Sequence, residues 1–391
     1  MSDHARPPGR LHTLDALRGV AALAVVLWHW NHFFHDGTTL VSFEPSHMPF
    51  YRWLSIFYDR GYLAVDLFFC LSGFIFYWLY AHRIHGKAIS AGKFLYLRFT
   101  RLYPLHAVTL LAVVLGQFIY HGMTGTAFVY EHNDLKHFFL NVFFVSSWGF
   151  KGFLSFNGPI WSVSVEVLLY CLFFVLTRFL PVRVSLMFIV SCLGYAVVYP
   201  HNPEIGRGIG SFFLGGIIYF VSERIRTFRN IVPVTYSVTF VAVALWLLTL
   251  YIFYGDINMA AFLQQMVPGH LHLEGKLQWV FAKAVSRWPI LVLFPMTILS
   301  LALLEARGGA YWQRLAGLGD ISYSVYLLHF PLQLYVAIVF GTFTLSRDIY
   351  ATPLFMFSFY VVLVVLGLVS YRFLERPAQK YLRDKGQHVF I

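Results

Sequence analysis

Long apolar runs separated by short polar segments dominate the chain. A membrane-spanning helix needs roughly 20 apolar residues, and ten runs of about that length occur, at about 14–31, 62–80, 104–120, 161–180, 184–200, 206–222, 232–254, 288–304, 321–341 and 353–374. A further apolar stretch, Phe138 to Trp148, is too short to cross and is expected to lie in the interface or to re-enter. The pattern predicts an all-α, polytopic membrane helix bundle of about ten transmembrane helices.

The composition supports this class of protein. Of 391 residues, 58% are hydrophobic and only 12% are charged, which is more apolar surface than a soluble chain can bury. The cysteines Cys70, Cys171 and Cys192 lie inside apolar runs without metal-ligand spacing, so neither a disulfide framework nor a metal site is expected. We expect a single transmembrane domain over residues 1–391.

The distribution of lysine and arginine predicts the orientation. The net charge is +11, but the basic residues form no dense tract, so nucleic acid is not an expected partner. Twenty of them fall on the side of the N-terminus and nine on the other, which predicts that both termini are cytoplasmic, with a short N-terminal segment at 1–12 and a tail at about 375–391. No cleavage site follows the first run, so it is expected to stay as an anchor in the cell (inner) membrane.

The first apolar run carries one ionisable group near each end. Eleven helical steps separate Arg18 from His29, which places both on one face, roughly 16 Å apart along the axis. Ionisable groups are costly in a membrane helix and favour a functional interpretation. The alternative is that Arg18 snorkels to a headgroup while His29 lies in the far interface.

Two acidic residues are predicted at the depth of His29. Asp66 lies about one turn inside the second run, where His29 would be a suitable partner; the alternative is that Asp66 only caps its helix. Ser162, Glu166 and Tyr170 recur at four-residue spacing and form a polar stripe that descends from the outer surface. Glu166 is flanked by apolar residues, so an exposed interfacial position is a poor explanation for it.

Basic and polar residues on other helices are further candidates. Arg98 and Arg101 project together before the third run and are suited to bind phosphate, although paired arginines are also topology signals. Arg207 could hold an anionic or hydroxylated substrate or anchor the helix in the interface. Tyr326 and His329 share a helix face with Ser322, and a satisfied core histidine is the alternative there. Glycines in two runs predict close helix packing: Gly73, Gly208, Gly210, Gly215 and Gly216.

With these stretches identified, the sequence resembles the membrane-bound acyltransferase-3 family, which acylates sugars and related molecules. The resemblance rests on motifs that occur in order over nearly the whole chain: Leu14-Asp15-x-Leu-Arg18-Gly19 followed by His29, Val65-Asp66-Leu67-Phe68-Phe69-x-Leu-Ser72-Gly73-Phe74, Arg98-x-x-Arg101-x-x-Pro104, Trp161-Ser162-x-x-x-Glu166-x-x-x-Tyr170, Ile321-Ser322-Tyr323-Ser324-x-Tyr326-x-x-His329-x-Pro331 and Glu375-x-Pro377. It implies a cytoplasmic acyl-CoA donor, usually acetyl-CoA, and a sugar or cell-envelope glycan as acceptor. Some relatives carry an added periplasmic hydrolase-like domain, which this chain is expected to lack.

The residues and the resemblance together predict a mechanism. The phosphates of the acyl-CoA would be held by Arg98 and Arg101, with its arm passing Arg18. His29, oriented by Asp66 or Glu166, would act as general base on an acceptor hydroxyl. Direct transfer is favoured because no cysteine neighbours the polar residues, and an acyl-histidine intermediate is left open. No metal is expected. A proton-coupled transporter of a small polar solute and a scaffold for glycan export are the alternatives.

Overall fold

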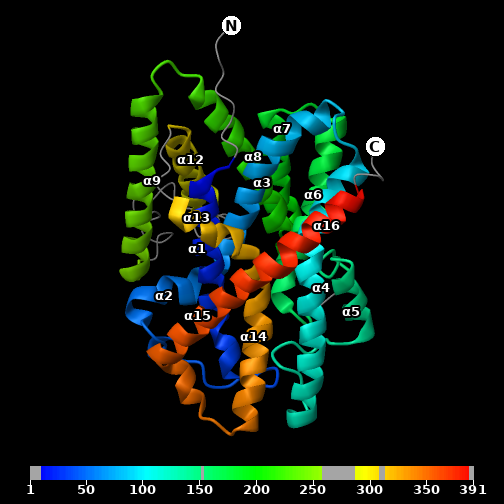
Figure 1. Cartoon of the computed structure of the whole chain (residues 1–391). Coiled ribbons are helices and arrows are strands. Elements are labelled where there is room, and N and C mark those ends of the chain that lie inside the picture. The colour runs from blue at the N-terminus through cyan, green and yellow to red at the C-terminus, as the bar shows by residue number, and fades with distance from the viewer. Residues whose placement is uncertain (1–9, 151–153, 258–286, 308–312, 387–391) are drawn as a thin grey trace.

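The computed structural model of the protein describes residues 10–150, 154–257, 287–307 and 313–386, and these are predominantly helical (Figure 1). The strands within the described residues form one small antiparallel hairpin, β1 (His35–Asp36) with β2 (Thr39–Leu40), in which His35 faces Leu40.

The described helices and the short segments between them follow in chain order. In chain order they are α1 (His12–Trp28), α2 (Tyr51–Arg60), α3 (Ala64–His85), α4 (Ala91–Thr124), α5 (Leu135–Val142), α6 (Trp161–Phe179), α7 (Val184–Leu193), α8 (Pro203–Arg226), α9 (Ile231–Tyr254), α12 (Phe294–Ala306), α13 (Gln313–Asp320), α14 (Ser322–Thr342), α15 (Pro353–Ser370) and α16 (Arg376–Gly386). The 3₁₀ segments are η1 (His29–Phe34), η2 (Pro45–His47), η3 (Gly61–Leu63), η4 (Gly158–Ile160) and η8 (Arg347–Ala351), and the π-helical segments are η5 (Gly194–Val198), η7 (Pro289–Leu293) and η9 (Tyr371–Glu375).

The predicted class is confirmed: within the described residues, eight helices are long and apolar enough to cross a membrane. The other two predicted spans form shorter helices. At the first, α1 has 17 residues and ends at Trp28, where the chain tightens into η1. At the other, α7 passes into the π-helical segment η5, and the combined helix Val184–Val198 has 15 residues. The stretch from Phe138 contributes to α5, which has eight residues and is too short to span, as predicted. Most of the segment between the predicted spans at 232–254 and 288–304 lies outside the described residues.

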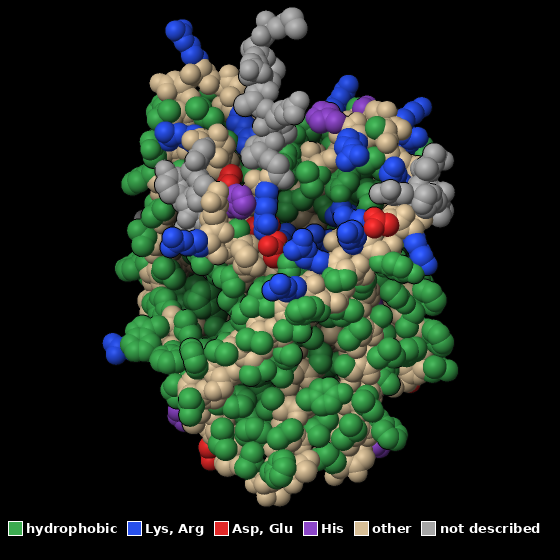
Figure 2. Space-filling model, in the orientation of Figure 1, with side chains coloured by type: hydrophobic (Ala, Val, Ile, Leu, Met, Phe, Trp, Pro, Cys, Tyr) green, Lys and Arg blue, Asp and Glu red, His purple; other side chains and the backbone are tan. Residues whose placement is uncertain are grey.

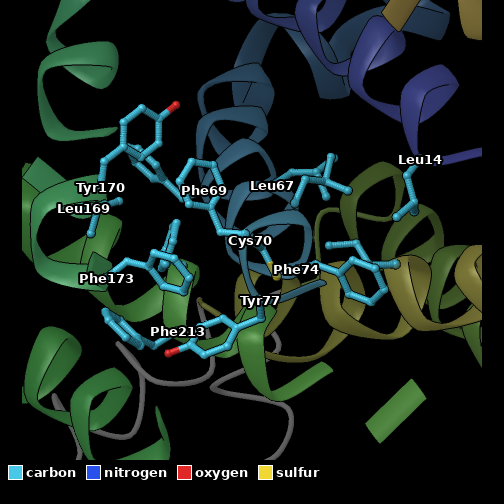
Figure 3. Packing of buried hydrophobic residues seen from close by; sticks show 14 of the residues in the cluster. Leu14, Leu67, Phe69, Cys70, Phe74, Tyr77, Leu169, Tyr170, Phe173 and Phe213 are labelled. Atoms are coloured by element: carbon cyan, nitrogen blue, oxygen red, sulfur yellow. The ribbon is translucent and has the colours of Figure 1, made fainter. Parts of the chain in front are cut away.

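The centre of the bundle is the pair α3 and α8, and glycines allow their close approach. A Cβ on Gly73 of α3 would overlap the carbonyl oxygen of Phe212, and one on Gly215 of α8 would overlap that of Cys70. Large side chains of α3 therefore reach between α6 and α8, where Tyr77 packs edge-on against Phe173 (Figure 3). The predicted glycine packing is confirmed, and it places the first turns of α3 and α8 side by side.

Charge is concentrated at one end of the bundle. Figure 2 shows most lysine and arginine side chains gathered in the upper half of the molecule, around a hollow in its surface, while the lower half of this face carries many apolar side chains and few charged ones. Exposed apolar side chains cover α9 and α15, for example Phe240, Leu247 and Phe357. In an integral membrane protein such side chains face lipid.

Candidate active site

Two imidazoles from opposite ends of the chain meet inside the bundle. His29 begins η1 directly after α1, and His329 lies in the middle of α14. The Nδ1 atom of His29 is 3.2 Å from the Nε2 atom of His329, and the rings stack with their centroids 5.0 Å apart. His329 is fully buried, whereas His29 is only partly buried. The structure thus brings together two histidines that the sequence only placed on separate helices.

The hydrogen bonds of this pair define which nitrogen carries each proton. The Nδ1 atom of His329 lies 2.6 Å from the carbonyl oxygen of Tyr326. A carbonyl only accepts, so this nitrogen is the donor, and in the neutral ring Nε2 is then an acceptor. The Nδ1–H group of His29 therefore donates to His329. With both rings neutral, Nε2 is then the unprotonated nitrogen of His29, which is the form a general base needs.

A second set of polar groups supports the backbone at His29. The side-chain amide of Gln333 donates to the carbonyl oxygen of His29 at 2.8 Å, and its oxygen accepts from Nδ1 of His32 at 2.9 Å. The hydroxyl of Tyr130 lies 3.3 Å from Nε2 of His32, which is left as an acceptor. Sequence reasoning missed Gln333 and His32. The available signal was that each is a polar residue in an apolar segment, one helical turn beyond a predicted site histidine.

Ser162 and Tyr326 also belong to this cluster. Their hydroxyls are 2.7 Å apart, and that of Tyr326 donates to the carbonyl of Pro159 at 2.8 Å. Because the backbone of Tyr326 binds His329, the start of α6 is linked to the imidazole pair through α14. The rings of Tyr326 and His329 lie with their centroids 5.8 Å apart, so the two side chains share a helix face as predicted.

The predicted pairing of Asp66 with His29 is wrong, because Arg207 takes this place. The Asp66 carboxylate is fully buried and forms a bidentate ion pair with Arg207, with Nη2 to Oδ2 at 2.5 Å and Nε to Oδ1 at 3.1 Å. Ser211 donates to the same carboxylate at 3.4 Å. The physical reason is the close packing of α3 on α8, which sets Arg207, one turn into α8, beside the first turn of α3.

Glu166 does not orient His29 either, which corrects the second predicted pairing. Its carboxylate accepts from the hydroxyl of Ser72 on α3 at 2.9 Å and is also hydrogen bonded to Tyr170. Tyr170 in turn stacks on Phe76, with centroids 4.6 Å apart. The predicted polar stripe on α6 therefore exists, but Glu166 faces α3, and the group that orients His29 is His329.

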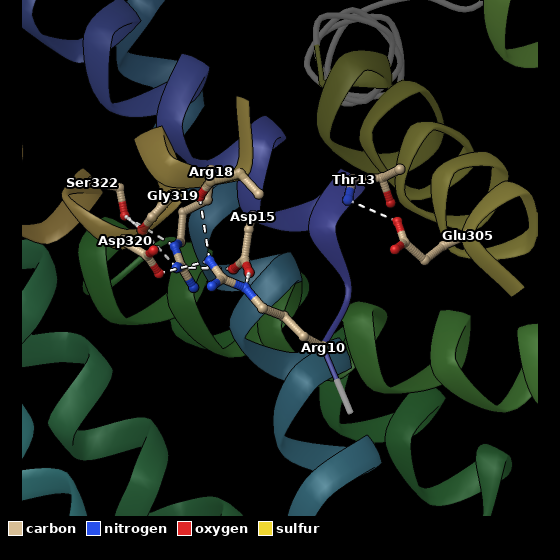
Figure 4. A network of polar contacts seen from close by, with 9 residues as sticks. Arg10, Thr13, Asp15, Arg18, Glu305, Gly319, Asp320 and Ser322 are labelled. Carbon is tan, nitrogen blue, oxygen red and sulfur yellow. Dashed lines mark hydrogen bonds and ion pairs between the residues drawn. The ribbon is translucent and has the colours of Figure 1, made fainter. Parts of the chain in front are cut away.

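Arg18 lies at the other end of α1, in a network that joins α1 to α13 and α14 (Figure 4). Its Nε donates to Ser322 at 3.0 Å, and its Nη2 donates to the carbonyl of Gly319 at 2.7 Å and pairs with Asp15 at 3.0 Å. Asp15 also pairs with Arg10, whose second carboxylate partner is Asp320. Partial burial opposes the charge of Arg10, but these carboxylates outweigh it and raise the pKa of its guanidinium.

Arg98 and Arg101 lie one turn apart on α4. Arg98 donates to the hydroxyl of Tyr80 and stacks over the rings of Tyr80 and Phe76, with its Cζ atom 4.9 and 5.2 Å from their centroids. Its Nε atom is buried and has no hydrogen-bond partner among the residues that the structure describes. Arg101 is exposed and close enough to Arg18 for their charges to interact. The structure thus gathers Arg18 and Arg101, from helices far apart in sequence, at the basic end of the bundle.

Comparison with known proteins defines the class. A family model described as an acyltransferase domain matches residues 11–372, nearly the whole chain. The chain therefore belongs to this acyltransferase family, and the resemblance seen in its motifs is confirmed.

Similar proteins come from several bacteria. The chain is 24% identical to the O-acetyltransferase OatA of Staphylococcus aureus over 98% of its own length and 59% of that relative. It is 32% identical to the acyltransferase MdmB of Streptomyces mycarofaciens, over 44% of this chain and 42% of the relative. It is 40% identical to protein 2 in the picA locus of Rhizobium radiobacter, over 29% of this chain and 48% of the relative. The chain thus spans about half the length of these curated relatives. No solved structure matches it.

Proposed function

We propose that this protein is a membrane O-acyltransferase that moves an acyl group, in the first place acetyl, from cytoplasmic acyl-CoA to a hydroxyl of a sugar or cell-envelope glycan. The single observation that carries the proposal is the contact of His29 Nδ1 with Nε2 of the buried His329, whose own Nδ1 binds the carbonyl of Tyr326. Membership of the acyltransferase family supports the reaction class, and the name of the relative OatA supports acetyl as the group.

In the proposed reaction, Nε2 of His29 accepts the proton of the acceptor hydroxyl while the hydroxyl oxygen attacks the thioester carbonyl. The new carbon–oxygen bond forms as the carbon–sulfur bond breaks. The leaving thiolate of CoA then takes the proton from the imidazolium, which returns His29 to its neutral form. The products are the acyl ester and free CoA, and no other reactant is needed. We keep direct transfer as the proposed route because no described cysteine contacts His29.

The arrangement of charge supports the direction of delivery. Arg18 and Arg101 lie at the basic end, and eleven residues lead from Arg18 along α1 to His29 at the start of η1, a rise of roughly 16 Å. Acyl-CoA has phosphates at one end and its reactive carbonyl at the other end of a thin arm. Its phosphates would therefore lie near the arginines at the basic end of the bundle, and its carbonyl near His29 farther along α1. We place the basic end, and with it both termini, on the cytoplasmic side of the cell membrane.

The test is acetyl transfer by the purified protein in lipid nanodiscs. Radiolabelled acetyl-CoA is incubated with envelope glycans extracted from a strain that lacks the gene, and mass spectrometry identifies molecules that gain an acetyl group. The proposal expects label in a glycan fraction together with stoichiometric release of CoA thiol. Solute flux into proteoliposomes without consumption of acetyl-CoA would overturn it in favour of a transporter.

A further inference from the structure

The C-terminal helix α16 lies across the start of α4 (Figure 1). The hydroxyl of Tyr96 on α4 donates to the carbonyl of Leu382 on α16 at 2.6 Å. A Cβ on Gly386 would overlap the ring of the same tyrosine. These contacts set the register of α16, and they place the next residue after Leu382, Arg383, beside the first turns of α4.

Arg383 and Arg98 are two neighbouring cations that have no ion-pair partner within the described residues. Arg383 lies close enough to Arg98 and Arg101 for the positive charges to interact, and the side chain of Tyr80, to which Arg98 donates, lies nearby. No ion pair among the described residues joins Arg383 or Arg98 to a carboxylate. Each of the two guanidinium groups also has a buried Nε atom for which the described part of the chain supplies no hydrogen-bond partner. Two cations held together with unused donors are the arrangement expected of a site for a doubly charged anion.

The position of this pair along α4 indicates which part of a ligand it meets. Arg98 is one turn nearer the start of α4 than Arg101, and Arg101 is the member close to Arg18. An acyl-CoA that extends past Arg18 toward His29 would place its diphosphate near Arg101. The phosphoryl group farthest from the thioester, on the 3′ position of the ribose, would then lie toward Arg98 and Arg383.

We infer that Arg383 of α16 and Arg98 of α4 together bind the 3′-phosphoryl group of the acyl-CoA donor. This inference rests on the proposed function. It assigns to α16 a role in donor specificity, because a thioester that lacks the 3′-phosphate would lose the interaction with Arg383 and Arg98. A phosphate from an anionic lipid headgroup offers the same chemistry, and the experiment separates the two sources.

The experiment compares two ligands and three proteins. Binding of acetyl-CoA and of acetyl-3′-dephospho-CoA is measured with the wild type, Arg383→Gln and Lys380→Gln, each in nanodiscs made of a zwitterionic lipid. Lys380 is an exposed cation on the same helix and serves as the matched control. A charged hydrogen bond contributes about 1.5–3 kcal/mol, so Arg383→Gln should weaken acetyl-CoA binding at least about tenfold. It should leave acetyl-3′-dephospho-CoA binding unchanged, and Lys380→Gln should alter neither.

Several results would overturn the inference. Equal weakening of both ligands by Arg383→Gln would show a general structural effect, and no weakening of either would show that Arg383 is not a ligand. If adding an anionic lipid stabilises the wild type but not Arg383→Gln, while acetyl-CoA binding is the same for both, the site binds a headgroup. If the wild type binds neither thioester, the proposed function itself fails. Thermal unfolding of each variant verifies that it is folded.

Discussion

The role of His329 gives the sharpest prediction about the imidazole pair. Replacing it with leucine removes the acceptor for Nδ1–H of His29, which lies 3.2 Å away in a buried setting. Losing such a bond and leaving the donor unsatisfied costs about 1–3 kcal/mol. If that cost falls on the orientation of His29 in the transition state, kcat should fall by roughly 5- to 150-fold. The loss must stay below that of His29→Ala, since general-base catalysis as a whole contributes about 10²- to 10⁴-fold.

The assay is the initial rate of CoA thiol release with the acceptor identified by mass spectrometry, at saturating acetyl-CoA. The decisive comparison is the double variant His29→Ala, His329→Leu. Because His329 acts through His29, its loss should cost nothing further once His29 is gone, so the double variant should match His29→Ala alone. His329→Gln retains a side-chain acceptor and should recover part of the rate. Additive losses in the double variant would refute the reasoning, because His329 would then act independently of His29.

Two further predictions concern the scaffold. Asp66→Asn breaks the buried pair with Arg207 and should lower the free energy of unfolding by about 3 kcal/mol, seen as a clear drop in melting temperature; an unchanged melting temperature would show that the pair is not a structural element. Gly73→Ala forces α3 away from the Phe212 carbonyl and should cost about 1–3 kcal/mol, whereas Gly122→Ala, where nothing lies within 4 Å of the new Cβ, should not destabilise the protein. Equal melting temperatures for the two alanine variants would contradict the packing account.

The positions of the membrane helices were predictable because a segment that crosses the hydrocarbon core must be helical and must be apolar over a nearly fixed length. All ten apolar runs form helices, and the predicted glycine faces are packing faces. Helix ends were less predictable: α1 ends just before His29, and α7 passes into a π-helical segment, because these ends depend on neighbouring helices. Hydropathy does not report such contacts.

The individual residues of the candidate site were predictable from the sequence, but their interaction partners were not. Arg18, Asp66, Glu166 and His329 stood out because charge or polarity is expensive in an apolar run. Their partners depend on which helices pack together. Because α3 packs closely on α8, Asp66 pairs with Arg207, and His29 contacts His329 instead of Asp66. Gln333 illustrates a different limit: nothing local to its sequence indicates that its amide binds the backbone of a residue 304 positions away.

The most direct test of the central claim is acetyl transfer by a folded His29→Ala variant. Its folding is verified by a melting temperature close to that of the wild type, and its donor site by unchanged binding of acetyl-CoA. We expect donor binding to be retained while transfer to the glycan falls by at least about a hundredfold, as expected for loss of a general base. Transfer at a rate near that of the wild type would contradict the account and remove this imidazole from the reaction.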